Sequence, residues 1–198
     1  MSDDKKIELL KDHYNDTFSE IKDKINNRNK MFLLLLVFCA LILFKIYSLD
    51  NFNIIIPEIV SKKLGITKGV NSFFINSILW FAILAASTKY FQYVINIERL
   101  YNYIHKQEVL LAKEFDNKSF NREGASYLNK YPVFSDWISF TYKIIFPVCF
   151  ILLILSNLWN DFNSATKDNF LFVINSIFCF YILISCSLYL IFLYKKNK

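Results

Sequence analysis

The 198-residue sequence has only three glycines, three prolines and two histidines. With so few glycines there is no glycine-rich loop of the kind that binds phosphate groups through backbone amides. No Cys and His residues fall at the spacing of zinc ligands. We therefore expect no cofactor and no metal site, and no enzymatic activity.

The four cysteines also do not form a disulfide framework, because each lies in an apolar stretch. We expect them to be reduced thiols that pack as small hydrophobic side chains. They are Cys39, Cys149, Cys179 and Cys186.

Long apolar runs are abundant, and 55% of all residues are hydrophobic. Four runs reach the roughly 20 residues that a helix needs to cross a bilayer core of about 30 Å. Backbone groups cannot stay unpaired in lipid, so each run must be helical. The sequence thus predicts an all-α, four-transmembrane-helix membrane protein with long cytoplasmic helical extensions. The expected parts are a cytoplasmic amphipathic helix (1–30), spans at 31–49, 70–95, 137–159 and 169–194, outer loops at 50–69 and 160–168, a cytoplasmic helical segment (96–136) and a basic tail (195–198).

The orientation follows from lysine and arginine in the connections, which favour the cytoplasmic side. Residues 1–30 carry seven of them, residues 96–136 carry six and the tail carries three, whereas the two outer loops carry four. We therefore expect both termini in the cytoplasm. Lys45, Lys89 and Lys143 fall near span ends, where we expect their ammonium groups to extend to the lipid headgroups.

Two apolar stripes at helical spacing lie outside the spans, one in residues 4–28 and one continuing the second span. The first thirty residues have balanced charge, which favours packing on protein over lying on a membrane surface. We expect the two stripes to pack together as a cytoplasmic interaction surface. Their members are Ile7, Leu10, Tyr14, Phe18, Ile21 and Ile25, and Ile97, Ile104, Leu111 and Phe115.

The larger outer loop contains the sequence PEIVSKKLG. Pro57 suits the first turn of a helix and Gly65 suits a helix end. We therefore expect a short interfacial helix between them.

Two spans share an internal similarity: residues 73–81 read FFINSILWF and residues 172–180 read FVINSIFCF. The similarity has two explanations, a pair of repeated helical hairpins or a coincidence in a chain of biased composition. Asn76 and Asn175 are amides that require hydrogen-bond partners in lipid. They could bond each other, line an oligomer axis or pore, or join neighbouring helices. Ala82 and Ala86 give the second span a face for close helix packing.

Arg99 and His105 fit the loose Arg-x(4–6)-His pattern of HEPN ribonucleases. The two residues lie well apart around a regular helix. The alternative is that Arg99 is a positively charged anchor and His105 a surface residue, and we favour this alternative.

The whole layout resembles the small four-span membrane accessory proteins, of the Csx type, that accompany the RNA-guided RNA nuclease of type VI-B CRISPR systems. The matching features are the length, the four spans, the N-terminal helix NDTFSEIKDKINNRNKMFLLLL and the segment ERLYNYIHKQEVLLAKEF. The resemblance implies an inner-membrane protein of a bacterium that modulates or executes antiviral defence. The implied partners are the lipid bilayer, further copies of the chain and the nuclease, without direct nucleic-acid binding.

Two rival functions stay open at this point. One is a binding protein that does not conduct ions, such as an immunity protein against a pore-forming toxin. The other is a membrane-tethered ribonuclease that uses Arg99 and His105.

Overall fold

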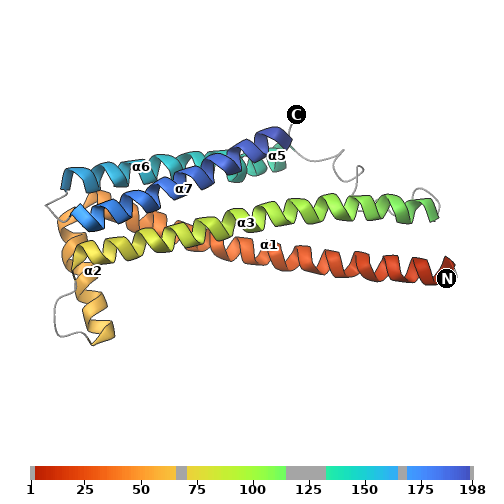
Figure 1. The fold of residues 1–198 in the computed structure, drawn as a ribbon, viewed down its shortest axis with the longest axis horizontal. Helices are drawn as coiled ribbons and strands as arrows, with labels where there is room; N and C mark the ends of the chain where they lie inside the picture. The colour runs from red at the N-terminus through yellow and green to blue at the C-terminus, as the bar shows by residue number, and fades with distance from the viewer. Residues whose placement is uncertain (1–2, 66–70, 115–132, 165–168, 197–198) are drawn as a thin grey trace. The chain divides into compact units, whose positions relative to one another are not determined.

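The computed structural model of the protein describes residues 3–65, 71–114, 133–164 and 169–196, and every regular element in these ranges is a helix (Figure 1). The predicted all-α fold is therefore confirmed. The elements are α1 (Asp3–Tyr47), α2 (Leu49–Leu64), α3 (Ser72–Glu114), α5 (Val133–Phe140), the π-helix η1 (Thr141–Ile145), α6 (Phe146–Ser164) and α7 (Asn169–Lys196).

Within the described ranges, four stretches are long and apolar enough to cross a membrane. They lie in α1, in α3, across η1 and α6, and in α7. The four predicted spans are therefore confirmed by the length and composition of these helices. The stretches are Ile7–Tyr47, Ser72–Ala112, Thr141–Asn163 and Phe170–Lys195.

The chain divides into two units. The first, Met31–Lys89 with Thr141–Lys198, contains the most apolar parts of all four helices, and we call it the membrane unit. The second comprises Met1–Lys30 and Tyr90–Phe140. We call its two long helical parts, residues 3–30 of α1 and 90–114 of α3, the helix pair. Both α1 and α3 contribute residues to both units without a break in the helix.

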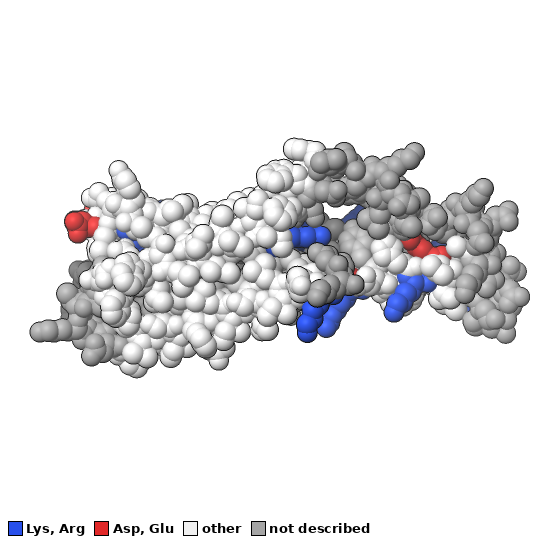
Figure 2. All heavy atoms as spheres, turned by 90° about the horizontal axis from the view of Figure 1, so that it is seen from above, with Lys and Arg blue, Asp and Glu red and all other residues white. Residues whose placement is uncertain are grey.

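The membrane unit is apolar outside as well as inside. Leucine, isoleucine, valine and phenylalanine side chains stay exposed on each of its long helices, and this part of the surface is almost free of charged residues in Figure 2. Such a surface suits lipid rather than water. The side chains in its interior include Leu35, Ile42, Trp80, Ile83, Phe150, Ile154, Ile182 and Tyr189.

The helix α2 follows α1 after the single residue Ser48 and takes a different direction from it in Figure 1. Gly65 ends the helix in the left-handed region, with φ of 65°, as the sequence predicted. The expectation for Pro57 is wrong, since the helix begins eight residues earlier, at Leu49, and Pro57 lies in its interior. Because proline has no N–H, the backbone carbonyl of Asn53 cannot accept a helical hydrogen bond from it.

The third span is one irregular helix rather than a uniform one. Its wide π-turn, Thr141–Ile145, comes directly before Phe146 and Pro147. Pro147 cannot donate to the carbonyl of Lys143, four residues earlier, and a wider turn is a common local adjustment to such a missing hydrogen bond.

Candidate functional site

Lys45 lies in the last turn of α1, where the sequence analysis expected its ammonium group at the lipid headgroups. That expectation is wrong, because the residue is only 3% exposed. Its Nζ donates to Oδ1 of Asn76 at 2.7 Å and pairs with the carboxylate of Asp161. The lysine therefore joins protein groups inside the membrane unit.

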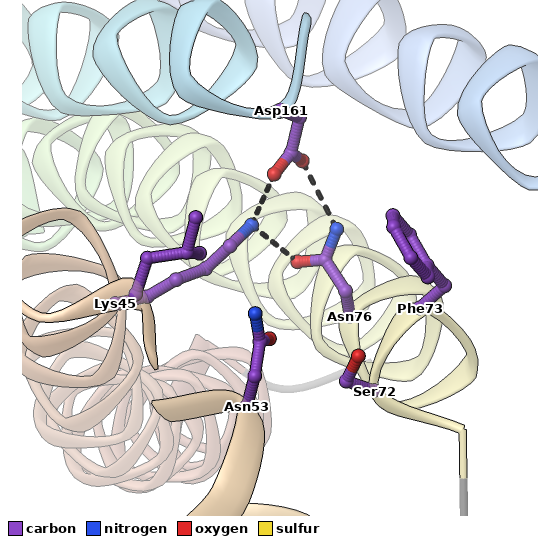
Figure 3. A pocket seen from close by; sticks show the side chains of 7 residues that line it. Lys45, Asn53, Ser72, Phe73, Asn76 and Asp161 are labelled. Carbon is purple, nitrogen blue, oxygen red and sulfur yellow. Dashed lines mark hydrogen bonds and ion pairs between the residues drawn. The ribbon is translucent and has the colours of Figure 1, made fainter. Parts of the chain in front are cut away.

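Asp161, near the end of α6, is the centre of this arrangement (Figure 3). Its Oδ1 accepts from Lys45, and its Oδ2 accepts from Nδ2 of Asn76 at 3.0 Å and from Nε1 of Trp80 at 3.1 Å. We call Lys45, Asn76, Trp80 and Asp161 the polar cluster. It connects α1, α3 and α6 through one carboxylate.

The cost of burying the charges of the polar cluster depends on whether all of its members are present. A buried charge is costly unless it is paired and its remaining hydrogen-bonding capacity is used. Here the ammonium of Lys45 and the carboxylate of Asp161 compensate each other, and the carboxylate accepts three hydrogen bonds. In the complete set the two charges compensate each other, whereas the loss of one charge leaves the other buried without a counter-charge.

A pocket of about 230 Å³ lies beside the polar cluster. Figure 3 shows the side chains of Asn53 and Ser72 directed toward the same space as Lys45 and Asn76. The polar groups of the wall are therefore an ammonium group, a carboxylate, two amides and a hydroxyl. Its lining residues are Lys45, Leu49, Asn53, Ser72, Phe73, Asn76 and Asp161.

The two asparagines singled out by the internal similarity have different surroundings. Asn76 is bonded to Lys45 and Asp161 and so joins neighbouring helices. Asn175 is 2% exposed, and its Oδ1 has no hydrogen-bond partner among the described residues. Nothing in the described contacts bonds the two to each other. Ala86 is buried and Ala82 is half-buried on α3.

Asn157 on α6 is a further buried amide that the sequence analysis did not single out. It is fully buried, and neither its Nδ2 nor its Oδ1 has a partner in the described part of the chain. It lies one helical turn before Asp161, on the same side of α6.

The helix pair has its own polar contacts. His13 Nε2 lies 2.7 Å from the hydroxyl of Tyr103, and the hydroxyl of Tyr14 donates to Oε1 of Glu108 at 3.3 Å. Gln107 also donates to the hydroxyl of Tyr103, at 2.7 Å. The bonds of His13 and Tyr14 connect residues 90 and 94 positions apart in the sequence, so residues 3–30 and 90–114 lie side by side.

The predicted stripes lie along this pair. Ile21, Ile97, Ile104 and Leu111 are buried. Phe115 lies outside the described residues. The half-buried members are Ile7, Leu10, Tyr14, Phe18 and Ile25.

Arg99 and His105 lie on α3, in the same unit as the helix pair. Arg99 is exposed, and Nδ1 of His105 lies 3.6 Å from Oε2 of Glu108. The described contacts do not bring the arginine and the histidine together.

The four cysteines are free thiols, and two of them, Cys179 and Cys186, are buried in α7. No cluster of three or more His, Cys, Asp or Glu residues suited to a metal ion occurs among the described residues. Comparisons with protein-family models, with curated proteins and with solved structures give no match to this chain.

Proposed function

We propose that this is a multi-pass protein of a bacterial inner membrane, with both termini and the helix pair in the cytoplasm. The support is the excess of lysine and arginine in residues 1–30, 96–136 and 195–198 over the other two connections. In this orientation the polar cluster lies near the outer surface, because it is at the end of α1 that leads into α2.

We further propose that it acts without catalysis as an accessory protein of RNA-targeting antiviral defence. The resemblance to four-span CRISPR accessory proteins supports this in its length, four spans and charged helical extensions. In this proposal an RNA-guided RNA nuclease acts on the helix pair, and an oligomer of the four-span unit perturbs the bilayer or regulates the nuclease.

One observation carries the proposal: α1 and α3 are uninterrupted helices of 45 and 43 residues that belong to both units. A helix transmits displacement along its axis because its backbone hydrogen bonds run from turn to turn. A partner that binds the helix pair can therefore influence the same two helices where they cross the bilayer.

The helix pair also offers a surface for such a partner. Leu9 is 54% exposed, Val109 58% and Leu110 49%. These side chains lie outside the membrane unit and are apolar, so a partner protein that covers them gains hydrophobic energy.

The experiment compares cells that carry the nuclease and a matching guide RNA, with and without this protein. Membrane potential is followed with a fluorescent dye after target RNA is induced. We expect depolarisation, or a change in RNA cleavage, only when all components are present, and loss of the effect in Leu110→Glu. Asn102→Glu, which adds the same charge at an exposed polar position of α3, is the matched control. Unchanged potential and cleavage, with a monomeric protein in detergent, would contradict the proposal.

A second candidate function is that of a non-conducting binding protein directed at the outside, such as an immunity protein against a pore-forming toxin. The observation in its favour is α2, a formed helix with exposed Ile54, Ile55 and Ile59. Replacing these three by serine should then abolish protection while Leu110→Glu has no effect.

The proposed function is non-enzymatic. Arg99→Ala and His105→Ala should leave it unchanged, and the purified protein should not cleave RNA. Cleavage that both substitutions abolish would instead assign the ribonuclease role.

A further inference from the structure

We propose that the pocket beside the polar cluster binds a phosphate group, carried by a phospholipid headgroup or present as a free phosphate ion. This inference does not depend on the proposed role in antiviral defence. It starts from the side chains of α1, α2, α3 and α6 around a pocket of about 230 Å³, some of whose hydrogen-bonding groups are unused.

Several hydrogen-bond donors in the pocket wall are unused. An ammonium group has three N–H donors and a side-chain amide has two. Lys45 uses two of its donors, on Asn76 and Asp161, so one is left. One N–H of Asn76 is bonded to Asp161, which leaves its second. The carboxylate, in contrast, already accepts three hydrogen bonds.

Asn53 and Ser72 add further capacity. Both line the pocket, and in Figure 3 both side chains are directed toward it. Neither forms a side-chain hydrogen bond with another described residue. An amide and a hydroxyl donate three more N–H or O–H groups between them. The oxygens of these two side chains can also accept, so the ligand is selected by Lys45, whose one unused group is a charged N–H donor that requires an acceptor oxygen.

The charge of the wall selects among such ligands. Because Asp161 already compensates the ammonium of Lys45, the wall is neutral overall, and an anion with one negative charge is less costly to place there than a dianion. A phosphodiester has one negative charge and two free oxygens, which matches the one unused N–H of Lys45 and the neutral donors beside it.

The position of the pocket favours lipid as the source. Its wall includes Leu49 and Asn53 of α2, which begins one residue after a span and exposes Ile54, Ile55 and Ile59. A phospholipid headgroup in the pocket would leave its acyl chains next to the apolar outer surface of the membrane unit.

The test uses the full-length protein, delipidated in a non-ionic detergent, with thermal stability as the readout. Phosphatidylglycerol is titrated against diacylglycerol with the same acyl chains, and sodium phosphate against sodium chloride at equal ionic strength. We expect phosphatidylglycerol to raise the melting temperature and diacylglycerol to have no such effect. An equal response to sodium phosphate identifies the free ion as a sufficient ligand.

Two variants and a control assign the effect to the pocket. In Asn53→Leu/Ser72→Ala the dissociation constant should rise by about tenfold, the equivalent of about 1.4 kcal/mol of lost hydrogen bonding. Asn53→Asp should weaken binding as well, because it adds a negative charge. Ser77→Ala, whose hydroxyl bonds the carbonyl of Phe73 and does not line the pocket, should bind like the wild type. Equal shifts with diacylglycerol and phosphatidylglycerol, or wild-type binding in both pocket variants, would overturn the proposal.

Discussion

At the scale of single residues, Asp161 has the most consequential contacts, since one carboxylate holds side chains from α1 and α3. Asp161→Leu should lower the free energy of unfolding by about 3–5 kcal/mol, because it leaves the ammonium of Lys45 buried and unpaired. Lys45→Met/Asp161→Leu should recover most of that loss. Chemical unfolding in mixed micelles measures both.

The control for this pair is Lys62→Met, since Lys62 is an exposed lysine at the end of α2. It should change the free energy of unfolding little. Equal destabilisation in the single and the double variant would contradict the account of the polar cluster.

For Asn157 we predict that a substitution raises the free energy of unfolding. Its amide is fully buried and has no partner among the described residues, so its desolvation is not offset. Asn157→Leu should raise the free energy of unfolding by about 1–3 kcal/mol, because a leucine of similar size removes this cost. The same unfolding assay reports it. A loss of stability would show that the amide has a partner in the folded protein.

At the scale of elements, the helix pair depends on its buried stripe. Ile104 is fully buried in it, whereas Val109 on the same helix is 58% exposed. Ile104→Ala should destabilise the pair by about 2 kcal/mol or more, through lost burial and a cavity. Val109→Ala should have little effect. Hydrogen exchange of residues 3–30 and 90–114 measures the difference, and similar protection in the two variants would contradict this packing.

The end of α2 provides a second test at this scale. Gly65 has φ of 65°, and a Cβ added there would meet nothing within 4 Å. Gly65→Ala should therefore cost only the conformational penalty, about 1–2 kcal/mol. Asn, which tolerates the left-handed region better, should cost less at this position. A larger loss of stability in Gly65→Asn than in Gly65→Ala would show that side-chain contacts, and not the backbone conformation, determine the cost of substitution at this position.

The elements also show which features the sequence could predict. Apolar runs and three- and four-residue spacing are local signals, so the helical class and the four spans could be read directly. The interior position of Pro57 was missed although Ser48, at the N-cap, and Asp50, in the first turn, are helix-start signals. The pairing of Lys45 with Asp161 joins positions 116 apart, and no local pattern reports such a contact. A sequence signal was nevertheless present: opposite charges near the same end of two predicted spans.

At the scale of the whole molecule, two long helices, α1 and α3, contribute residues to both units. Residues 3–30 and 90–114 pack on each other, while the remaining parts of α1 and α3 belong to a unit whose outer surface is apolar. Only placement of the membrane unit in a bilayer gives its exposed leucines, isoleucines and phenylalanines a suitable solvent. The proposed function requires that placement with α2 outside and the helix pair inside, whereas the binding of a phospholipid headgroup in the pocket requires only that the membrane unit lies in a bilayer.

Site-directed labelling of intact cells tests this arrangement most directly. In a variant with the four native cysteines replaced by alanine, single cysteines are introduced at Leu110 and Lys62, both exposed. A membrane-impermeant maleimide should label position 62 in intact cells, and position 110 only after the cells are permeabilised. Labelling of position 110 in intact cells, or release of the protein from membranes by alkaline carbonate, would contradict the central claim.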